Sequence, residues 1–327
     1  MSRRRRKLRR VGRPLSAKPL GGDCRELIVT HTERQERAIR AAVAVANRLG
    51  MTSVTPVILK DSNHTSIHLV PFPVVARVVA PRVGQDPSTA LSAELLVAEH
   101  LARAGAPIVA PTIDVPPGPH LEANETMTLW QFVAHCPAEE SDGPVAAEGL
   151  REIHSALGSY LGRLPSFEVA LDACRRLLQE ETALPALATP DKHFLLTEHD
   201  RLRRLLAAAA MAPVAIHGDP HLGNVLMTPR GPRWTDWESV CLGPLEWDLA
   251  CLPESTLAIV PAVNTELLAV LRDLRSVCVA VWCWAEPDRA SEKRQAAEYH
   301  LRRLRERSRA AASPAAQRRA VGPLQET

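Results

Sequence analysis

The chain has 327 residues, of which 46% are hydrophobic, so it is long enough to bury a sizeable core in two domains or lobes. It contains no window of 18 uncharged apolar residues, and it therefore predicts no membrane-spanning helix. The formal net charge of +3 hides an uneven distribution, because residues 21–300 carry a net charge of −11 and both ends are basic. An acidic body argues against a nucleic-acid-binding face and suits a cationic small molecule.

The two ends of the chain have the composition of disordered segments. Residues 1–20 contain nine Lys or Arg and no acid, and no apolar run follows them, so we expect a basic disordered leader rather than a secretory signal. Binding of this leader to nucleic acid or to an anionic membrane is the alternative. Residues 313–327 are expected to form a flexible tail.

The seven cysteines are scattered, odd in number and without a C-x-x-C pair. This usage is typical of a reduced, cytoplasmic protein with incidental thiols. No feature of the sequence indicates an oligomeric state.

The first part of the chain predicts a small lobe rich in β-strands. Helical periodicity over 33–49, ended by Gly50, predicts a helix, and a second helix with a Ser or Thr cap is predicted over 88–105. The predicted strands cover residues 54–60, 65–70, 73–80 and 126–134. A turn at Asp61–His64 joins the first two strands as a hairpin.

Beyond residue 134 the composition changes to segments rich in Ala and Leu, which predict helices. The predicted helices cover residues 144–163, 168–182 and 191–210, with two or three more toward the end of the chain. We therefore predict an α+β fold of two lobes. Residues 21–134 would form a small β-rich N-terminal lobe that ends in a hinge, and residues 135–312 would form a larger, mainly helical C-terminal lobe.

The segment from Ala215 to Ala250, AIHGDPHLGNVLMTPRGPRWTDWESVCLGPLEWDLA, places ionisable residues in short turns between apolar strands. Asn224 follows Asp219 by five residues, past a turn, and a strand–turn–strand unit then returns Asp236 to the same place. The three side chains are therefore expected to converge. They combine one carboxylate that can act as a base with an amide oxygen and a second carboxylate that suit Mg²⁺, which is the set that phosphoryl transfer requires.

A zinc site is an alternative for the same segment, because His217 and His221 stand four residues apart with Asp219 between them. That spacing binds zinc on a helix. Pro220 and Gly223 break the helix that such ligands need, and the pattern H-E-x-x-H is absent, so the sequence favours the phosphoryl-transfer interpretation.

The order H-G-D-x-x-x-x-N, D-W-E and W-D-L-A resembles the aminoglycoside phosphotransferase and choline kinase-like family, which has the protein-kinase-like fold. The resemblance covers most of residues 50–290. It implies that Asp219 is the catalytic base and that Asn224 and Asp236 hold magnesium ions. It also implies structural roles for His217 and Asp248, which would support the loop that carries the base.

The same resemblance implies a nucleotide site in the N-terminal lobe. Arg77, in VVARV, occupies the position of the basic residue on the third strand, and Glu94 occupies that of its acidic partner. Ser62 and Asn63 stand where the family has its phosphate-covering loop, and Trp130 lies in the hinge that binds adenine through backbone groups. Two features depart from the family: an Arg replaces the usual Lys on the third strand, and the loop contains no glycine.

These observations predict an enzyme, a small-molecule kinase that uses ATP and Mg²⁺ to phosphorylate a hydroxyl group, with an aminoglycoside, a related antibiotic or an amino-alcohol as the first candidate acceptors. The alternative is a catalytically weak, nucleotide-binding regulatory protein of the same fold, which the two departures favour. The acceptor pocket is expected from the helices after Asp248. Its candidate acids are Glu254, Glu266, Glu286 and Asp288.

Overall fold

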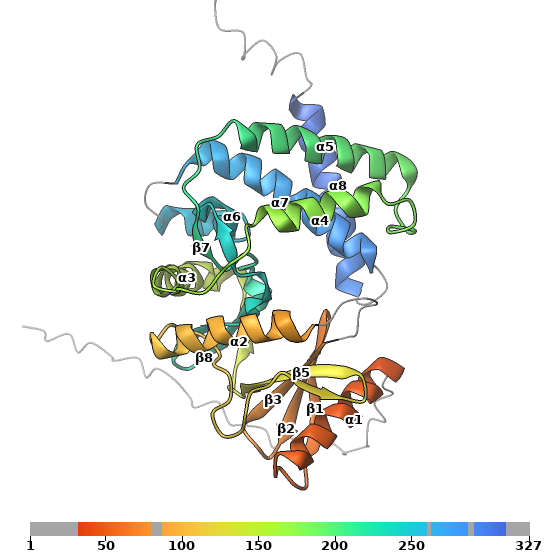
Figure 1. The fold of residues 1–327 in the computed structure, drawn as a ribbon. Helices are drawn as coiled ribbons and strands as arrows, with labels where there is room; N and C mark the ends of the chain where they lie inside the picture. The colour runs from red at the N-terminus through yellow and green to blue at the C-terminus, as the bar shows by residue number, and fades with distance from the viewer. Residues whose placement is uncertain (1–31, 80–86, 260–262, 287–290, 312–327) are drawn as a thin grey trace, which may run out of the picture.

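A computed structural model describes residues 32–79, 87–259, 263–286 and 291–311. The predicted leader and tail lie outside these ranges. The fold is α+β, as predicted, with an antiparallel sheet at one end and a group of helices at the other (Figure 1). No helix among the described residues combines the length and the apolar character needed to cross a membrane.

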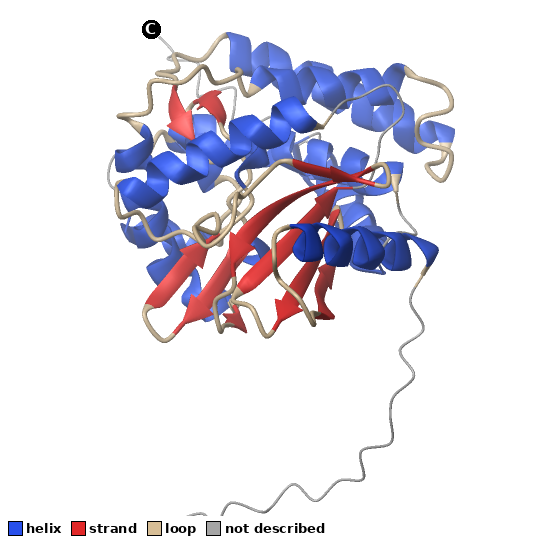
Figure 2. Cartoon of the chain, turned by 60° about the horizontal axis from the view of Figure 1, so that its bottom comes forward, coloured by secondary structure: helices blue, strands red, loops and turns tan. Residues whose placement is uncertain are grey.

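Five antiparallel strands form the sheet of the small lobe, in the order β1-β2-β3-β5-β4. Their bounds are β1 Thr55–Asp61, β2 His64–Val70, β3 Val74–Val79, β4 His120–Glu122 and β5 Glu125–Gln131. Strand β4 lies in a proline-rich stretch for which the sequence predicted no strand. Helix α1, Glu33–Arg48, covers one face of the sheet (Figure 2). Its small buried residues, such as Ala38, Ala42 and Val45, recur at helical spacing and let the helix approach the strands closely.

Helix α2, Ser88–Arg103, lies between the sheet and the helical lobe (Figure 1) and packs against β5 and the short 3₁₀ helix η3, Trp237–Ser239. Leu95, Ala98 and Leu101 bury its apolar face. The predicted side-chain cap is wrong, because the residue before the helix is Pro87, which has no side-chain donor or acceptor. The helix ends before Gly105, whose φ of +74° is the left-handed conformation that favours glycine.

The large lobe is mainly helical. Its helices are α3 Gly143–Leu157, α4 Glu168–Gln179, α5 Thr189–Ala207, α6 Leu245–Leu249, α7 Thr265–Ala285 and α8 Ser291–Ala311. Helix α7 is central and contacts α4, α5, α6 and α8. Because it is surrounded on several sides, α7 is apolar over most of its circumference, with Leu271, Val277 and Val281 fully buried.

Short strands between α5 and α7 carry the turns of the motif segment. Strand β8, Val225–Thr228, pairs with β9, Gly231–Trp234, and with β6, Cys136–Pro137. Strand β7, Val214–Ile216, pairs with β10, Cys241–Gly243. The two small sheets fix both ends of the loop over residues 217–224, which we call the HGD loop.

Candidate active site

The HGD loop leaves β7 through a conformation that only glycine can adopt. Gly218 has φ +88°, and a Cβ atom at this position would lie 2.0 Å from the carbonyl oxygen of Ser239. The carbonyl of Gly218 accepts hydrogen bonds from Trp247 Nε1 at 2.9 Å and from an Arg275 guanidinium N–H at 3.2 Å. The peptide group that precedes Asp219 is therefore held by two side-chain donors.

Asp248, at the end of α6, anchors the start of the loop. It is fully buried, and its two carboxylate oxygens accept the backbone N–H groups of His217 and Gly218, each at 2.8 Å. One of these oxygens also lies 2.7 Å from Nε2 of His154 on α3. A buried carboxylate is tolerated only with such partners, and here they tie the loop to two helices.

His217 is fully buried, with its ring against Trp237 at 4.7 Å between centroids. Its Nε2 lies 3.1 Å from the carbonyl of Thr235, and its Nδ1 lies 3.4 Å from the backbone nitrogen of Asp219. Burial lowers the pKa of His217, so the ring is neutral at neutral pH. Each ring nitrogen of His217 already contacts a backbone group, which disfavours the alternative in which this histidine binds zinc.

Asp219 is partly exposed, and it forms an ion pair through Oδ1 with Arg275 of α7. Its second oxygen lies 4.0 Å from Nε2 of His221. Asn224 donates from Nδ2 to the carbonyl of Asp219 at 3.0 Å, which closes the HGD loop on itself. Sequence reasoning did not identify Arg275, which lies on α7, 56 residues downstream of Asp219. The available signal was an arginine directly before the uncharged segment over residues 276–285.

The β8–β9 hairpin brings Asp236 beside Asn224. Thr235 donates its N–H and its hydroxyl to the carbonyl of Asn224, at 2.9 and 3.1 Å. Asp236 follows with φ 73° and ψ 71°, a left-handed conformation that is strained for a residue other than glycine. Its Oδ1 lies 2.5 Å from a guanidinium nitrogen of Arg77. Asp236, the last residue of the predicted cluster, thus contacts Arg77 of the predicted nucleotide site.

Arg77 on β3 is buried among acids. It forms an ion pair with Glu94 of α2 and lies 3.7 Å from Glu238. Burial disfavours the charged guanidinium, but Glu94, Asp236 and Glu238 outweigh this effect and raise the pKa of Arg77 above its ordinary value. Glu94 also accepts the backbone N–H of Trp237 at 3.2 Å. The predicted Arg77–Glu94 pair is therefore present, and it connects the sheet, α2 and η3.

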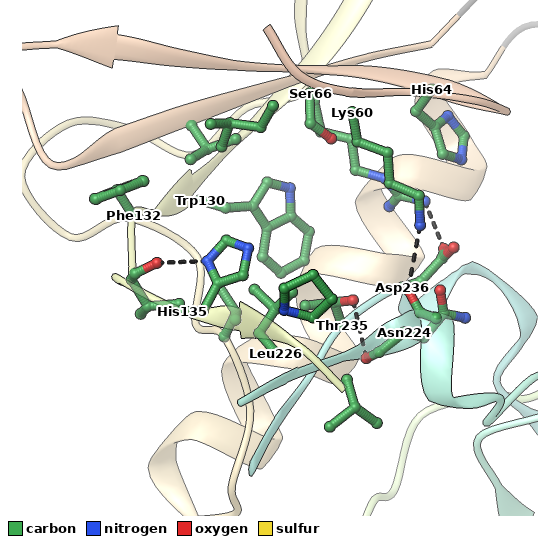
Figure 3. A pocket seen from close by; sticks show the side chains of 18 of the residues that line it. Lys60, His64, Ser66, Trp130, Phe132, His135, Asn224, Leu226, Thr235 and Asp236 are labelled. Carbon is green, nitrogen blue, oxygen red and sulfur yellow. Dashed lines mark hydrogen bonds and ion pairs between the residues drawn. The ribbon is translucent and has the colours of Figure 1, made fainter. Parts of the chain in front are cut away.

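A cavity of about 380 Å³ lies between the two lobes. Asn224, Asp236 and Lys60 stand toward one end, and the ring of Trp130 lies along the cavity with Phe132 beyond it (Figure 3). The indole Nε1 of Trp130 donates to Thr128 at 2.9 Å, so the apolar part of the ring is free to line the cavity. After Trp130, the backbone N–H of Gln131 donates to the carbonyl of Ala110, and the backbone N–H of Phe132 donates to the carbonyl of Pro73.

The turn between β1 and β2 covers the polar end of the cavity. Ser62 lines the cavity, whereas Asn63 is exposed and is not one of its lining residues. Asp61 holds the glycine-free turn through an ion pair with Arg34 and hydrogen bonds from Gln35 and Thr65, both at 2.8 Å. Side chains from α1 and β2 thus order this turn.

Two further residues of this hairpin reach the other lobe, and sequence reasoning missed both. Lys60 donates from Nζ to the carbonyl of Gly223 at 3.2 Å, and His64 Nε2 lies 3.0 Å from Glu238. His64, Asp236 and Glu238 place ligand-type atoms within 4.8 Å of one another. Arg77 already supplies positive charge to both of these acids, so the group is accounted for as an ion-pair network.

Three solved structures illustrate the fold similarity. A choline/ethanolamine kinase family protein from Mesorhizobium loti aligns with a TM-score of 0.56 and 17% identity, covering 87% of this chain and 97% of its own. The amicoumacin kinase hAmiN, in complex with AMP-PNP, Ca²⁺ and Ami, aligns with a TM-score of 0.60, 12% identity and coverages of 85% and 97%. The GDP complex of aminoglycoside 2'-phosphotransferase-IIIa aligns with a TM-score of 0.58, 13% identity and coverages of 81% and 99%.

No curated protein matches the sequence. The family model described as "Phosphotransferase enzyme family" matches residues 20–307, which span most of the chain. At these identities the solved structures establish the protein-kinase-like fold alone, and the family model establishes membership. The chain therefore belongs to the phosphotransferase enzyme family.

Proposed function

We propose that the chain transfers the γ-phosphate of ATP, as its magnesium complex, to a hydroxyl group of a small molecule in the cytoplasm. The observation that carries this proposal is the HGD loop, in which Asp248 anchors the backbone that leads to Asp219 while Asn224 and Asp236 line the adjoining cavity. Family membership supports the reaction class.

The donor atoms near Asp236 suit Mg²⁺. Asn224 commits Nδ2 to the carbonyl of Asp219, and Arg77 occupies Oδ1 of Asp236, which leaves Oδ1 of Asn224 and Oδ2 of Asp236 for a cation. Mg²⁺ prefers such hard oxygen ligands and takes few of them from the protein. When bound, the ion would neutralise charge on the phosphates of the nucleotide.

The remaining roles follow from position and charge. Asp219 would orient the acceptor hydroxyl and accept its proton, since it is the carboxylate of the HGD loop and is partly exposed. Arg77, buried and positively charged beside Glu94, and Lys60, at the same end of the cavity, would contact phosphate oxygens. Trp130 would pack against the nucleotide base with its ring, with Ser62 and Asn63 above the phosphates. His217 and Asp248 would hold the loop.

The proposed lobes are those expected from the sequence, residues 21–134 and 135–312, with the run over residues 128–134 as the hinge between them. The acceptor would approach Asp219 from the side of α7. Two candidate acids there are already paired: Glu254 with Arg272 at 2.8 Å and Glu286 with Lys293 at 3.1 Å. Asp288 lies outside the described residues, and Glu266 is an exposed residue in the first turn of α7. An aminoglycoside, a related antibiotic or an amino-alcohol stays the first acceptor to test.

An ATP-consumption screen against a panel of aminoglycosides, choline, amino-alcohols, sugars and macrolides tests the proposal. We expect at least one acceptor to stimulate ADP formation, with labelled phosphate recovered on the acceptor. A second arm measures the melting temperature with Mg²⁺ and ATP, which should rise through binding to the native state. ATP binding without transfer to any acceptor would favour the regulatory alternative, and no binding at millimolar ATP would contradict both.

A further inference from the structure

Arg275 is a buried cation on α7, directly before the uncharged second half of that helix, and the roles proposed so far make no use of its charge. Its side chain is 9% exposed and projects from α7 toward the HGD loop. Its guanidinium donates to the carbonyl of Gly218 at 3.2 Å and forms an ion pair with Oδ1 of Asp219. Two consecutive positions of the loop are thus held by one side chain.

Two indole rings flank the same guanidinium. The Arg275 Cζ atom lies 5.3 Å from the ring centroid of Trp247 and 5.4 Å from that of Trp282. Such contacts stabilise a cation and restrict the orientation of its planar head. Burial lowers the pKa of Arg275 to about 10, so the group is charged at neutral pH. A buried charge of this kind is tolerated when it is paired, and its carboxylate partner here is the proposed base.

We propose that Arg275 is a positioning residue for Asp219. It holds Oδ1 and fixes the preceding peptide group, so that Oδ2 is the atom presented to the acceptor hydroxyl. Its charge also offsets the repulsion between the Asp219 carboxylate and the phosphate groups that must come close to it. This inference rests on the proposed function of Asp219, and it adds a residue from α7 to a site otherwise formed by the HGD loop and the hairpins.

The guanidinium fork is essential to this role. A lysine at position 275 would keep the charge, but a single ammonium group cannot reproduce the fixed fork that contacts Gly218 and Asp219 together. We therefore expect Arg275→Lys to be intermediate between the parent and Arg275→Met. Arg272, three residues earlier on α7, is the matched control, because its side chain is 14% exposed and pairs with Glu254, away from the loop.

The test is a double-mutant cycle between positions 219 and 275, read as kcat and KM with the best acceptor from the screen. Arg275→Met should lower kcat about 10- to 100-fold, the scale of a misplaced catalytic group, with the KM for ATP changed less than about threefold. Arg275→Lys should recover part of this loss, and Arg272→Met should stay within about twofold of the parent. In the Asp219→Asn background, Arg275→Met should lower kcat by less than about threefold.

The cycle separates positioning from a purely structural role. Equal losses of kcat from Arg275→Met in both backgrounds, or a loss that matches the unfolded fraction in thermal melts, would overturn the positioning role. Arg275→Lys keeps the cycle measurable if Arg275→Met does not fold. Absence of transfer by the parent would instead overturn the proposed function of Asp219, and this inference with it. An active parent with no coupling between the two positions would overturn the inference alone.

Discussion

The HGD loop and the β1–β2 hairpin face each other across the cavity, and they are ordered in different ways. The HGD loop is held mainly through its backbone, by Asp248, Trp247 and Arg275. The hairpin is held through side chains, chiefly those that converge on Asp61. The loop keeps the family pattern and the hairpin departs from it. A loop held through its backbone can change the side chains at many of its own positions and keep its anchors, whereas a turn held through its own side chains loses the anchors when those residues change.

The largest effect is expected when the base is removed and the anchors are left in place. Asp219→Asn keeps the shape of the side chain and removes the proton acceptor, so turnover should fall about 10²–10⁴-fold, the usual range for a positioned acid–base group. Nucleotide binding should change little, because Asp219 is not one of the residues that line the cavity. Steady-state turnover and ATP titration by thermal shift measure the two effects. Near-normal transfer by this variant would remove Asp219 from the role of base.

Asp236→Asn acts where the two sides of the cavity meet. It removes a negative charge both from the proposed magnesium site and from the contact with Arg77. Turnover should fall on the order of 10²-fold, and, unlike Asp219→Asn, the variant should require more Mg²⁺ for half-maximal rate and bind ATP more weakly. The Mg²⁺ dependence of rate and of ATP-induced stabilisation checks this. Identical profiles for the two variants would contradict the division between base and metal ligand.

Asp248→Asn tests the backbone anchor itself. One of the two amide donors from His217 and Gly218 would then face an N–H group in place of an oxygen, so we expect a loss of about 1–3 kcal/mol in the free energy of unfolding. Chemical denaturation measures this loss, and Asp61→Asn provides the equivalent change in the partly exposed side-chain anchor. We expect the smaller loss for Asp61→Asn. A variant of Asp248 with unchanged stability would show that the loop does not depend on this carboxylate.

The smallest effect concerns pH. Burial lowers the pKa of His217, and it lowers that of His300 on α8 to about 4. In the unfolded chain an imidazole titrates near 6.5, so between about pH 6.5 and 4 the unfolded state binds more protons. The free energy of unfolding should therefore fall as the pH is lowered through this window. His300→Gln should make this slope shallower, on the order of 1 kcal/mol per pH unit at most. Urea midpoints at several pH values would show it, and an unchanged slope would contradict the assignment.

The fold class, and the segment in which the candidate site lies, could be predicted from the sequence because their signals are local. Asp219, Asn224 and Asp236 lie within one segment whose turns bring them together, and periodicity located most helices and strands. The contacts that cross the chain did not follow. Arg275 and Lys60 meet the HGD loop from distant elements, and nothing in their own neighbourhoods specifies a partner. Strand β4 escaped notice because it is a run of only three residues that directly follows several prolines.

The three contacts to Asp61 have a consequence for the entropy of ligand binding. A glycine-rich loop is free before its ligand arrives, and ordering it on binding costs conformational entropy. Here Arg34, Gln35 and Thr65 order the turn through contacts within the protein itself. Much of that entropy would therefore be lost during folding, and the proposed nucleotide would meet a turn that is already organised. On the proposed function, a preorganised turn of this kind would offset part of the affinity that the close backbone approach of a glycine loop would give.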